Sequence, residues 1–576
     1  MNNKLPYTRL LKRRIILISM GILLLVAACQ PAQVIITEVS ATNTPAPTPS
    51  AATSTATSLP GPTSTPALLT VSTDGPRLPQ EAVSDIYPAG IIPSTPGSQA
   101  DIIIEMIEPG QEYASISYRV YALAAPFFTI QDDISLKELN DYLTDKSDIQ
   151  DAPFAGIDAR STDKTVLQIL INPDNPQSVD IIDQPFYFLN DPTDKEPWSI
   201  LPFENLTPAF KVISIDGVSP LDDDFDPATY PLTLAVGLRL TDADLEVDPA
   251  LLDEILLESN YQPNRLTSLI MTGVTAMARD TAYEMEIQGV LYPGTEIRDV
   301  MRAADFTHIS NEVSFYEGCK FPDPDYTGFI FCSNPEYIRL LDDLGADIIE
   351  LTGNHNNDVR ALYKVDSVPF TLGLYEKYGM QWYAGGINLE NSRAPLKIEH
   401  NGNKLAFIGC NYYGPEMAWA TEDESGAAPC EDFTWMQREI FNLKQEGYLP
   451  IVTLQYQEDY SLYATSKAIQ DFRPLAEAGA IIVNGSQSHI AKGMEFYADA
   501  FVHYGLGNLF FDQPGFYITY DSFIQKHFFY MGRHISTQLL TITLEDTAKP
   551  RFMTPEEREK FLFDIFTVSE HLRRNQ

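Results

Sequence analysis

Basic residues are scarce in this sequence of 576 residues: 39 lysines and arginines stand against 79 aspartates and glutamates, a formal net charge of −40. A surface of this sign repels nucleic-acid phosphates and anionic headgroups, which argues against DNA, RNA or a peripheral membrane patch as partner. Long apolar runs are also missing after the N-terminus, which excludes a polytopic membrane protein. The 44% of hydrophobic residues suffices for cores in roughly two to four domains.

The one long apolar run covers residues 15–26 and follows a basic start. It is too short to span a bilayer comfortably but suits the core of a signal peptide. The run ends in Val-Ala-Ala before Cys29, which resembles the bacterial lipobox, where the cysteine receives a diacylglycerol. We predict that residues 1–28 are a lipoprotein signal peptide. Cys29 would then anchor the protein to the cell membrane, facing outside the cytoplasm; the alternative is a short membrane anchor with an incidental cysteine.

Residues 29–79 lack the composition of a folded domain. From residue 37 to residue 67 the chain is almost entirely Thr, Pro, Ala and Ser and contains no aromatic residue, so it cannot bury a core. We predict a disordered stalk over 29–79 that lifts the folded part off the membrane, either O-glycosylated or a plain linker.

Cysteine is rare, and only Cys319, Cys332, Cys410 and Cys430 follow Cys29. An even number of cysteines in an exported chain suggests disulfides, and four cysteines allow three pairings. We favour the local pairs Cys319–Cys332 and Cys410–Cys430. No CxxC or Cys/His spacing indicates a zinc finger.

Residues 80–250 alternate short apolar runs with turn signals. The runs at 102–104 and 166–171 are predicted to be buried strands. A helix is predicted to start at 135–139, with Asp133 as a possible cap.

Three segments of this region, 132–146, 197–220 and 230–240, resemble the phosphate-type substrate-binding proteins of ABC transporters in order and spacing. The resemblance implies a substrate-binding-protein-like α/β domain over 80–250. The stretch is short for two full lobes and shows no Gly/Ser/Thr cluster for an anion. An unrelated α/β accessory domain is the alternative.

Residues 262–545 alternate apolar strands with helical stretches, which is typical of a layered α/β fold. An amphipathic helix is predicted at 294–305, and residues 546–576 are predicted to form a helical tail. The predicted strands are 265–273, 345–353, 403–410, 449–455 and 478–485.

Polar residues follow these predicted strands, where the chemistry of such sheets gathers. After the successive strands come Gly273, Val274 and Thr275; Asn311 and Glu312; Asn354, His355 and Asp358; Gln455; Ser486, Gln487 and His489; and finally Asn508 and Asp512.

Five blocks of this second region together resemble the poly-γ-glutamate capsule biosynthesis (CapA) family, which belongs to the metallophosphatase-like α/β sandwiches. The blocks read ADFTHISNEVSF, LTGNHNND, YAGGINLENSRAPLKIEHNGNKLAFIG, AGAIIVNGSQSHIAKGMEFY and YGLGNLFFDQ, in that order. The resemblance implies a calcineurin-like layered sandwich over 262–545 and a role with polyglutamate or a related anionic polymer.

The resemblance also implies a metal site with missing ligands. Calcineurin-like phosphatases hold two metals with Asp, His and Asn at strand ends, and a metal pair clamps both oxygens of an in-line displacement. The family pattern places Asp, His and often His where this chain has Val274, Gln455 and Ser486. We therefore expect at most one divalent ion, of Mn, Fe or Zn.

Several residues that remain for such a metal site could have structural roles instead. The remaining ligand set is Glu312, Asn354, His355 and His489, with His355 and Asp358 as catalytic candidates and Asn311 and Asn508 as further site residues. Asn311 or Asn354 could instead fix a loop, Glu312 could pair with an arginine, and Asp358 could cap the helix that follows. The other six histidines have no motif support and are expected to be structural or exposed.

These expectations combine into a lipid-anchored surface protein with a degraded metal site. It would act in capsule or extracellular polymer biosynthesis or handling, leaning away from enzymatic activity. Its partners would be the membrane, through the lipid anchor, and an anionic polymer or its synthesis machinery. The alternatives are a secreted metal-dependent phosphoesterase and a non-catalytic surface binding module.

Overall fold

The computed structural model describes residues 68–73, 91–94, 99–108, 110–144, 152–183, 195–242, 245, 247–256, 258–513 and 515–573. The predicted signal peptide, Cys29 and nearly all of the predicted stalk lie outside them. The described residues belong to one compact unit. Among them, no helix is both long enough and apolar enough to cross a membrane.

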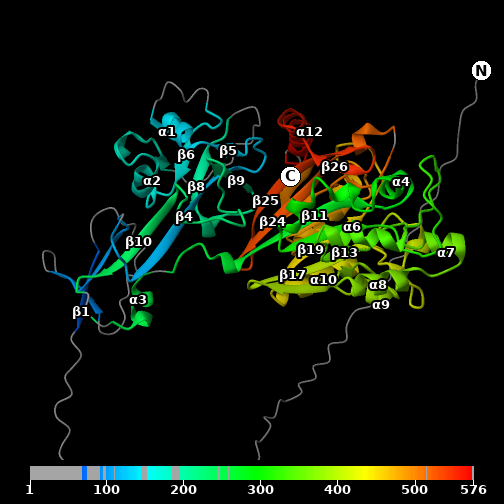
Figure 1. The fold of residues 1–576 in the computed structure, drawn as a ribbon, viewed down its shortest axis with the longest axis horizontal. Coiled ribbons are helices and arrows are strands. Elements are labelled where there is room, and N and C mark those ends of the chain that lie inside the picture. Colours follow the sequence, from blue (N-terminus) through cyan, green and yellow to red (C-terminus); the bar gives the residue numbers. More distant parts are fainter. Residues whose placement is uncertain are drawn as a thin grey trace, which may run out of the picture. The chain divides into compact units, whose positions relative to one another are not determined.

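The first part of the described chain is built on one mixed sheet (Figure 1). Its strand order is β2-β1-β3-β10-β4-β8-β6-β7, with β9 paired to β4 and β5. The strands are β1 (Leu69–Thr73), β2 (Ile91–Pro93), β3 (Ile102–Met106), β4 (Ser115–Pro126), β5 (Asp133–Ile134), β6 (Ile157–Ala159), β7 (Ile182–Asp183), β8 (Trp198–Pro202), β9 (Phe210–Ile215) and β10 (Thr233–Leu240). The helices are α1 (Leu136–Thr144), α2 (Lys164–Ile171) and α3 (Pro249–Ile255).

Three sequence predictions are wrong here. Residues 166–171 belong to helix α2 and not to a strand, because a short apolar run fits a buried helix as well as a buried strand. Ser135, and not Asp133, caps α1: Glu138 N donates to Ser135 Oγ at 3.1 Å, and Ser135 N donates to the Glu138 carboxylate at 3.1 Å. Residues 69–73 of the expected stalk form β1, whose β-branched residues favour a strand.

The second part of the chain is an α/β sandwich of two sheets. The first sheet has the order β14-β13-β12-β11-β24-β25-β26, with β23 paired to β11, and the second has the order β16-β17-β19-β20-β22-β21. The first comprises β11 (Leu266–Thr275), β12 (Phe306–Asn311), β13 (Ile348–Glu350), β14 (Gln381–Tyr383), β23 (Asn508–Phe510), β24 (Asp521–Tyr530), β25 (Arg533–Glu545) and β26 (Lys549–Phe552). The second comprises β16 (Leu396–His400), β17 (Asn403–Asn411), β19 (Leu449–Gln455), β20 (Ile482–Ser486), β21 (Met494–Tyr497) and β22 (Ala500–His503); β15 (Gly385–Gly386) pairs with β18 (Gly426–Ala427).

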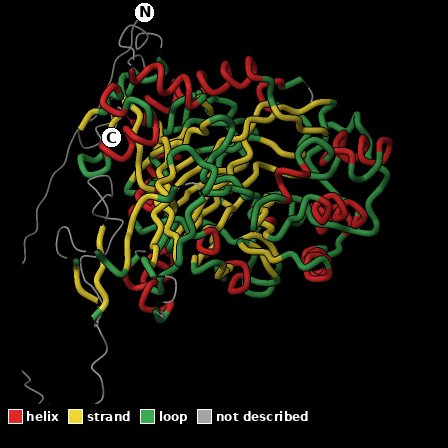
Figure 2. Tube along the Cα trace, turned by 60° about the vertical axis from the view of Figure 1, so that its left-hand side comes forward, coloured by secondary structure: helices red, strands yellow, loops and turns green. Residues whose placement is uncertain are grey.

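Alternating side chains build the layers of the sandwich. Leu269 and Met271 of β11 pack in one hydrophobic cluster with Phe407 of β17 and Ile451 of β19, so the two sheets face each other. The intervening Ile270 packs on the opposite side, in a cluster with residues of α4, α6 and α8. The outer face of the second sheet is covered by α10 and α11. Helices therefore flank both sheets, as Figure 2 shows, and the layered sandwich expected from the sequence is confirmed.

The helices of this part are mostly short. They are α4 (Arg279–Gln288), α5 (Arg298–Arg302), α6 (Ile338–Asp343), α7 (Asp358–Tyr363), α8 (Val368–Lys377), α9 (Leu389–Arg393), α10 (Thr434–Gln445), α11 (Ser466–Glu477) and α12 (Pro555–Arg573). The predicted helix at 294–305 shrinks to α5. The predicted helical tail begins with β26, which completes the first sheet, and α12 packs Leu562 and Ile565 into a core cluster.

Four histidines are buried inside the sandwich, as structural residues. His308, His503, His527 and His534 are each at most 8% exposed. His527 Nδ1 lies 2.9 Å from Thr537 Oγ1, and His308 Nε2 lies 2.9 Å from the Tyr383 hydroxyl. Burial lowers the pKa of His308, His503 and His534 to about 3 and that of His527 well below its usual value.

The mixed sheet of the first part, β1 to β10, shares its hydrophobic core with the sandwich. Phe528, Tyr530 and Ile535 of β24 and β25 belong to the same hydrophobic cluster as the core of residues 71–261. The Tyr530 hydroxyl donates to Asn260 O at 2.8 Å, and its ring lies 5.1 Å from that of Phe203. A change in either part therefore disturbs packing in the other.

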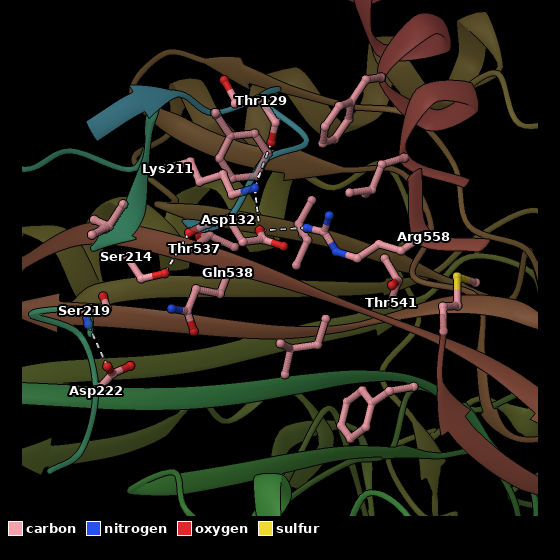
Figure 3. A pocket seen from close by; sticks show the side chains of 18 of the residues that line it. Thr129, Asp132, Lys211, Ser214, Ser219, Asp222, Thr537, Gln538, Thr541 and Arg558 are labelled. Carbon is pink, nitrogen blue, oxygen red and sulfur yellow. Dashed lines mark hydrogen bonds and ion pairs between the residues drawn. The ribbon is translucent and has the colours of Figure 1, made fainter. Parts of the chain in front are cut away.

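A cavity of about 340 Å³ lies at this junction, between β9, β25 and α12 (Figure 3). Asp132 holds two cations there: its Oδ1 lies 2.6 Å from Lys211 Nζ and 2.8 Å from Arg558 Nη2. Lys211 also donates to Thr129 O at 2.9 Å and Ile130 O at 3.0 Å. Burial lowers the pKa of Lys211 to about 8, against the opposing charge of Asp132. The ion pairs of Asp132 with Lys211 and Arg558 join the two parts.

Candidate functional site

The carboxyl ends of parallel strands from both sheets of the sandwich surround a larger cavity of about 720 Å³. β11, β12 and β13 run parallel in the first sheet, as β17, β19 and β20 do in the second. The loops after these strands bring Asn354, His355, Gln487 and His489 to the cavity wall. The position agrees with the expectation that site residues follow the strands.

Four polar side chains meet beside this cavity, around the amide of Gln455. Its Nε2 lies 3.0 Å from Glu312 Oε2, 3.1 Å from Asn354 Oδ1 and within hydrogen-bonding distance of Gln487 Oε1, so three acceptors share the two hydrogens of the amide. Its Oε1 accepts from Ser486 Oγ at 2.7 Å, which fixes the orientation of the amide. Glu312 is 1% exposed, and its Oε1 has no hydrogen-bond partner. An amide donor therefore occupies the point at which three acceptor oxygens converge.

His355 is oriented by Asp358, three residues along the chain. Its Nδ1 donates to Asp358 Oδ2 at 2.7 Å, and the same carboxylate oxygen accepts from Phe331 N, also at 2.7 Å. Burial lowers the pKa of His355, but the bond to Asp358 and the charge of Glu312 outweigh it and raise the pKa above its usual value. Helix α7 begins at Asp358 and has Asn357 at its N-cap, with no capping bond from a side chain. Asp358 therefore serves His355 and not the helix.

His489 has a different environment. Its Nδ1 donates to Asn508 Oδ1 at 2.9 Å, and its ring stacks on Phe511 with centroids 4.4 Å apart. Burial lowers the pKa of His489, more than Glu312 and Asn508 raise it. The two imidazoles therefore differ in protonation: the surroundings of His355 favour the protonated cation, and those of His489 favour the neutral ring. In each, Nε2 is the nitrogen left for a ligand.

Arg279 is the one arginine that lines this cavity among the described residues. Its Nε lies 3.3 Å from Asp512 Oδ2, and its guanidinium lies over the rings of Phe331 at 4.8 Å and Phe511 at 5.0 Å. Burial raises the pKa of Asp512 to about 6, although Arg279 opposes it. The arginine is therefore held by partners on several sides.

The two predicted disulfides are confirmed, and both close loops that line the cavity. Cys319 and Cys332 are joined with Cα atoms 5.7 Å apart, and Cys410 and Cys430 with Cα atoms 5.0 Å apart. The first loop carries Tyr326, Phe329 and Ile330 to the wall; the second carries Tyr413, Pro415 and Met417. The crosslinks hold irregular backbone in place where no sheet does so.

The described residues do not fit a pair of metal ions. Val274 is fully buried in an apolar cluster with Ala276, Val313, Phe331 and Phe511. No group of three or more His, Cys, Asp or Glu side chains within the described part of the chain is placed to hold a metal. The oxygens of Glu312, Asn354 and Gln487 that could bind a cation face an N–H₂ group instead.

Most of the sequence-predicted site residues meet at this cavity. Asn354, His355, Asp358 and His489 line it, Asn508 contacts His489, and Glu312 is joined to Asn354 through the amide of Gln455. Asn311 serves the fold: its Nδ2 donates to Val313 O at 3.0 Å and to the Tyr375 hydroxyl at 2.7 Å. Sequence reasoning missed Arg279, Glu458 and the aromatic wall, which come from loops and a helix start without a motif.

Comparison with known proteins shows that the sandwich is similar to capsule synthesis proteins. Residues 268–513 match the family model described as "Bacterial capsule synthesis protein PGA_cap". The "PGA biosynthesis protein CapA" of Bacillus subtilis (strain 168) is 24% identical over 235 residues, 40% of this chain and 60% of that protein. The "Capsule biosynthesis protein CapA" of Bacillus anthracis is 20% identical over 281 residues, 48% of this chain and 67% of that protein.

Solved structures are less similar to this chain in sequence identity, and their TM-scores are low. A phosphatase from Mycoplasma pneumoniae is 10% identical with a TM-score of 0.30, over 52% of this chain and 99% of that chain. The NAD nucleotidase of Haemophilus influenzae is 13% identical with a TM-score of 0.27, over 52% and 55% of the two chains. An ABC-type phosphate transport receptor from Vibrio cholerae is 11% identical with a TM-score of 0.20, over 27% and 72%. At these TM-scores no assignment rests on the likeness, and the substrate-binding-protein-like character of residues 80–250 stays a prediction.

Proposed function

We propose that this chain, which contains a CapA-like capsule synthesis domain over residues 268–513, acts at the cell surface in making or handling a capsule or other extracellular polymer. Cys29 would anchor it to the membrane by a lipid, and the cavity at the strand ends of the sandwich would hold the polymer or a piece of it. The metal site of this cavity is degraded and takes at most one divalent ion.

One observation favours polymer binding over phosphoester hydrolysis as the role of this cavity. The amide of Gln455 holds the oxygens of Glu312, Asn354 and Gln487, and Val274 stands in an apolar cluster beside them. A metal pair needs anionic or imidazole ligands at these points to clamp the attacking and leaving oxygens. The inner wall carries Asn354, Gln487 and the two histidines, whose side chains are fixed by hydrogen bonds, and this suits recognition of a polar ligand.

Genetics in the source bacterium tests this proposal. Deletion of the gene should lower the cell-associated polymer, and the wild-type gene should restore it. A His355→Ala variant should restore less, since His355 lies in the cavity wall; His571→Ala, on α12, is the matched control and should restore fully. Unchanged polymer in the deletion strain would contradict the proposal.

A metal-dependent phosphoesterase is the second candidate, because His355 and His489 both line the cavity. Two imidazoles whose pKa values are displaced in opposite directions are typical of acid and base roles. Purified protein should be assayed on a generic phosphodiester with Mn²⁺, Fe²⁺ or Zn²⁺. Turnover that His355→Ala abolishes would establish this candidate in place of the first.

A further inference from the structure

Exposed aromatic and apolar side chains line the mouth of the 720 Å³ cavity. Phe329 is 79% exposed and Phe516 is 56% exposed, while Tyr413 and Tyr460 are 44% and 38% exposed. Tyr460 and Phe516 stack with their centroids 5.5 Å apart. Large apolar groups left in water around one cavity indicate a contact surface for a ligand.

The charges of this cavity argue against a polyanion. Asp358, Glu458 and Asp512 line it, and Arg279 is the one lysine or arginine among its described lining residues. Arg279 is already paired with Asp512 and enclosed by two phenylalanine rings. The second cationic group of the wall, His355, is paired with Asp358 at 2.7 Å. An incoming carboxylate would therefore meet the Glu458 carboxylate and find both cationic groups already paired, in a chain of net charge −40.

The inner wall argues against a lipid. Asn354, Gln487 and the two site histidines present amide and imidazole groups that donate and accept hydrogen bonds. An acyl chain in this space would leave those groups without partners, at a cost for each one. The Glu458 carboxylate in the wall accepts from Tyr413 at 3.2 Å and from Tyr460, so the aromatic rim and the polar wall are connected.

We propose that this cavity binds an uncharged glycan chain. Sugar rings offer apolar C–H faces, which stack on aromatic side chains, and hydroxyl edges, which donate to carboxylates and accept from amides. Phe329, Phe516 and Tyr460 supply the stacking surface, while Asn354, Gln487 and Glu458 supply the polar partners. This inference rests on the proposed function, since it takes the cavity as the place where polymer is held, and it replaces the anionic polymer expected from the family resemblance.

Binding to defined polymers tests the ligand class. Full-length protein is titrated by calorimetry with two uncharged hexamers, of glucose (β-1,4) and of N-acetylglucosamine, and with two polyanions, hexagalacturonate and poly-γ-glutamate. An uncharged hexamer should bind, and both polyanions should bind at least about tenfold more weakly at low salt. Hexagalacturonate is the matched control, since it keeps the sugar ring and adds the charge.

Variants of the rim locate the binding. Phe329→Ala with Phe516→Ala should weaken binding of the uncharged hexamer about tenfold. Phe563→Ala removes an aromatic ring that is 62% exposed on α12, outside the cavity lining, and should leave binding unchanged. Both changes are at exposed side chains, so melting temperatures should match the wild type.

Three outcomes overturn the inference: poly-γ-glutamate binds as tightly as the uncharged hexamers, hexagalacturonate binds as tightly as they do, or none of the probes binds. The proposed function fails separately, through unchanged polymer in the deletion strain. Loss of polymer on deletion together with poly-γ-glutamate binding would keep the function and reject the glycan.

Discussion

Gln455 donates its side-chain amide to the carboxylate of Glu312 at 3.0 Å, across 143 residues of sequence. The contact joins the end of β19 in one sheet to the loop after β12 in the other. The family resemblance implies a histidine at the position of Gln455, and here the amide donates to the oxygens around it. The same contact leaves Glu312 Oε1 buried without a partner.

The first prediction concerns metal content. Wild-type protein dialysed against Mn²⁺ or Zn²⁺ should retain at most one ion per chain by elemental analysis. Val274→Asp with Gln455→His should raise the occupancy, because the pair adds a carboxylate and an imidazole and removes the amide donor. Val274→Asn with Gln455→His is the control without the added charge and should retain less. Two tightly held ions in the wild type would contradict the account.

The second prediction concerns acid stability. His308, His503, His527 and His534 are neutral in the fold and become protonated in the unfolded chain below its pKa of about 6.5. The unfolded state thus binds more protons between pH 6.5 and about 3, so the free energy of unfolding falls as the pH falls through this window. Each histidine contributes on the order of 2 kcal/mol by pH 5.

Buried acids oppose this trend, Glu350 and Asp512 most strongly. Burial raises the pKa of Glu350 to about 7 and that of Asp512 to about 6. Both acids therefore take up a proton in the fold before they do so in the unfolded chain, and this stabilises the fold as the pH falls from 7 to 4.5. Burial also raises the pKa values of Asp158, Glu196, Asp222, Asp347 and Asp521. The four histidines, at about 2 kcal/mol each by pH 5, set the net slope, which stays positive. Urea unfolding at several pH values should show it, and His534→Gln should make the slope shallower. His400→Gln, at a partly exposed histidine, is the control; a stability independent of pH from 6.5 to 5 would speak against neutral buried histidines.

Particular residues show what the sequence could predict. Strand β11 was predictable because the short apolar run at residues 269–271 ends near Gly273, and β17, β19 and β20 contain similar short apolar runs. The pairs Cys319–Cys332 and Cys410–Cys430 were predictable from local spacing. Residues 166–171 were not, because six apolar residues suit either a helix or a strand.

The site was predictable only in part, for a related reason. His355 and His489 carry a motif and follow strands, and both reach the cavity. The partners that decide their chemistry come from distant loops: Arg279 reaches Asp512 across 233 residues. Contacts of this kind depend on how the two sheets pack, and neither periodicity nor local spacing records them.

The third prediction concerns the disulfides. Cys410→Ser with Cys430→Ser should lower the free energy of unfolding by about 2 kcal/mol, the lower end of the usual range, because both cysteines are buried in a large core. Cys319→Ser with Cys332→Ser should change stability less and should weaken ligand binding, because that loop carries Phe329. Peptide mass mapping that finds four free thiols in exported protein would contradict both.

The fourth prediction concerns the N-terminus. The wild-type protein should carry acyl mass on Cys29 and stay in the detergent-extracted membrane fraction. Cys29→Ala should remain unprocessed and leave that fraction. Membrane retention of this variant, with no acyl mass on the wild type, would remove the lipid anchor from the account.

The central claim is that the cavity at the strand ends is where this protein handles extracellular polymer. The most direct test measures cell-associated polymer in the deletion strain after complementation with matched expression levels. Wild type and Phe563→Ala should restore the polymer, whereas Phe329→Ala with Phe516→Ala should leave it near the level of the deletion strain. Full restoration by the Phe329/Phe516 double variant, at wild-type protein abundance, would contradict the claim.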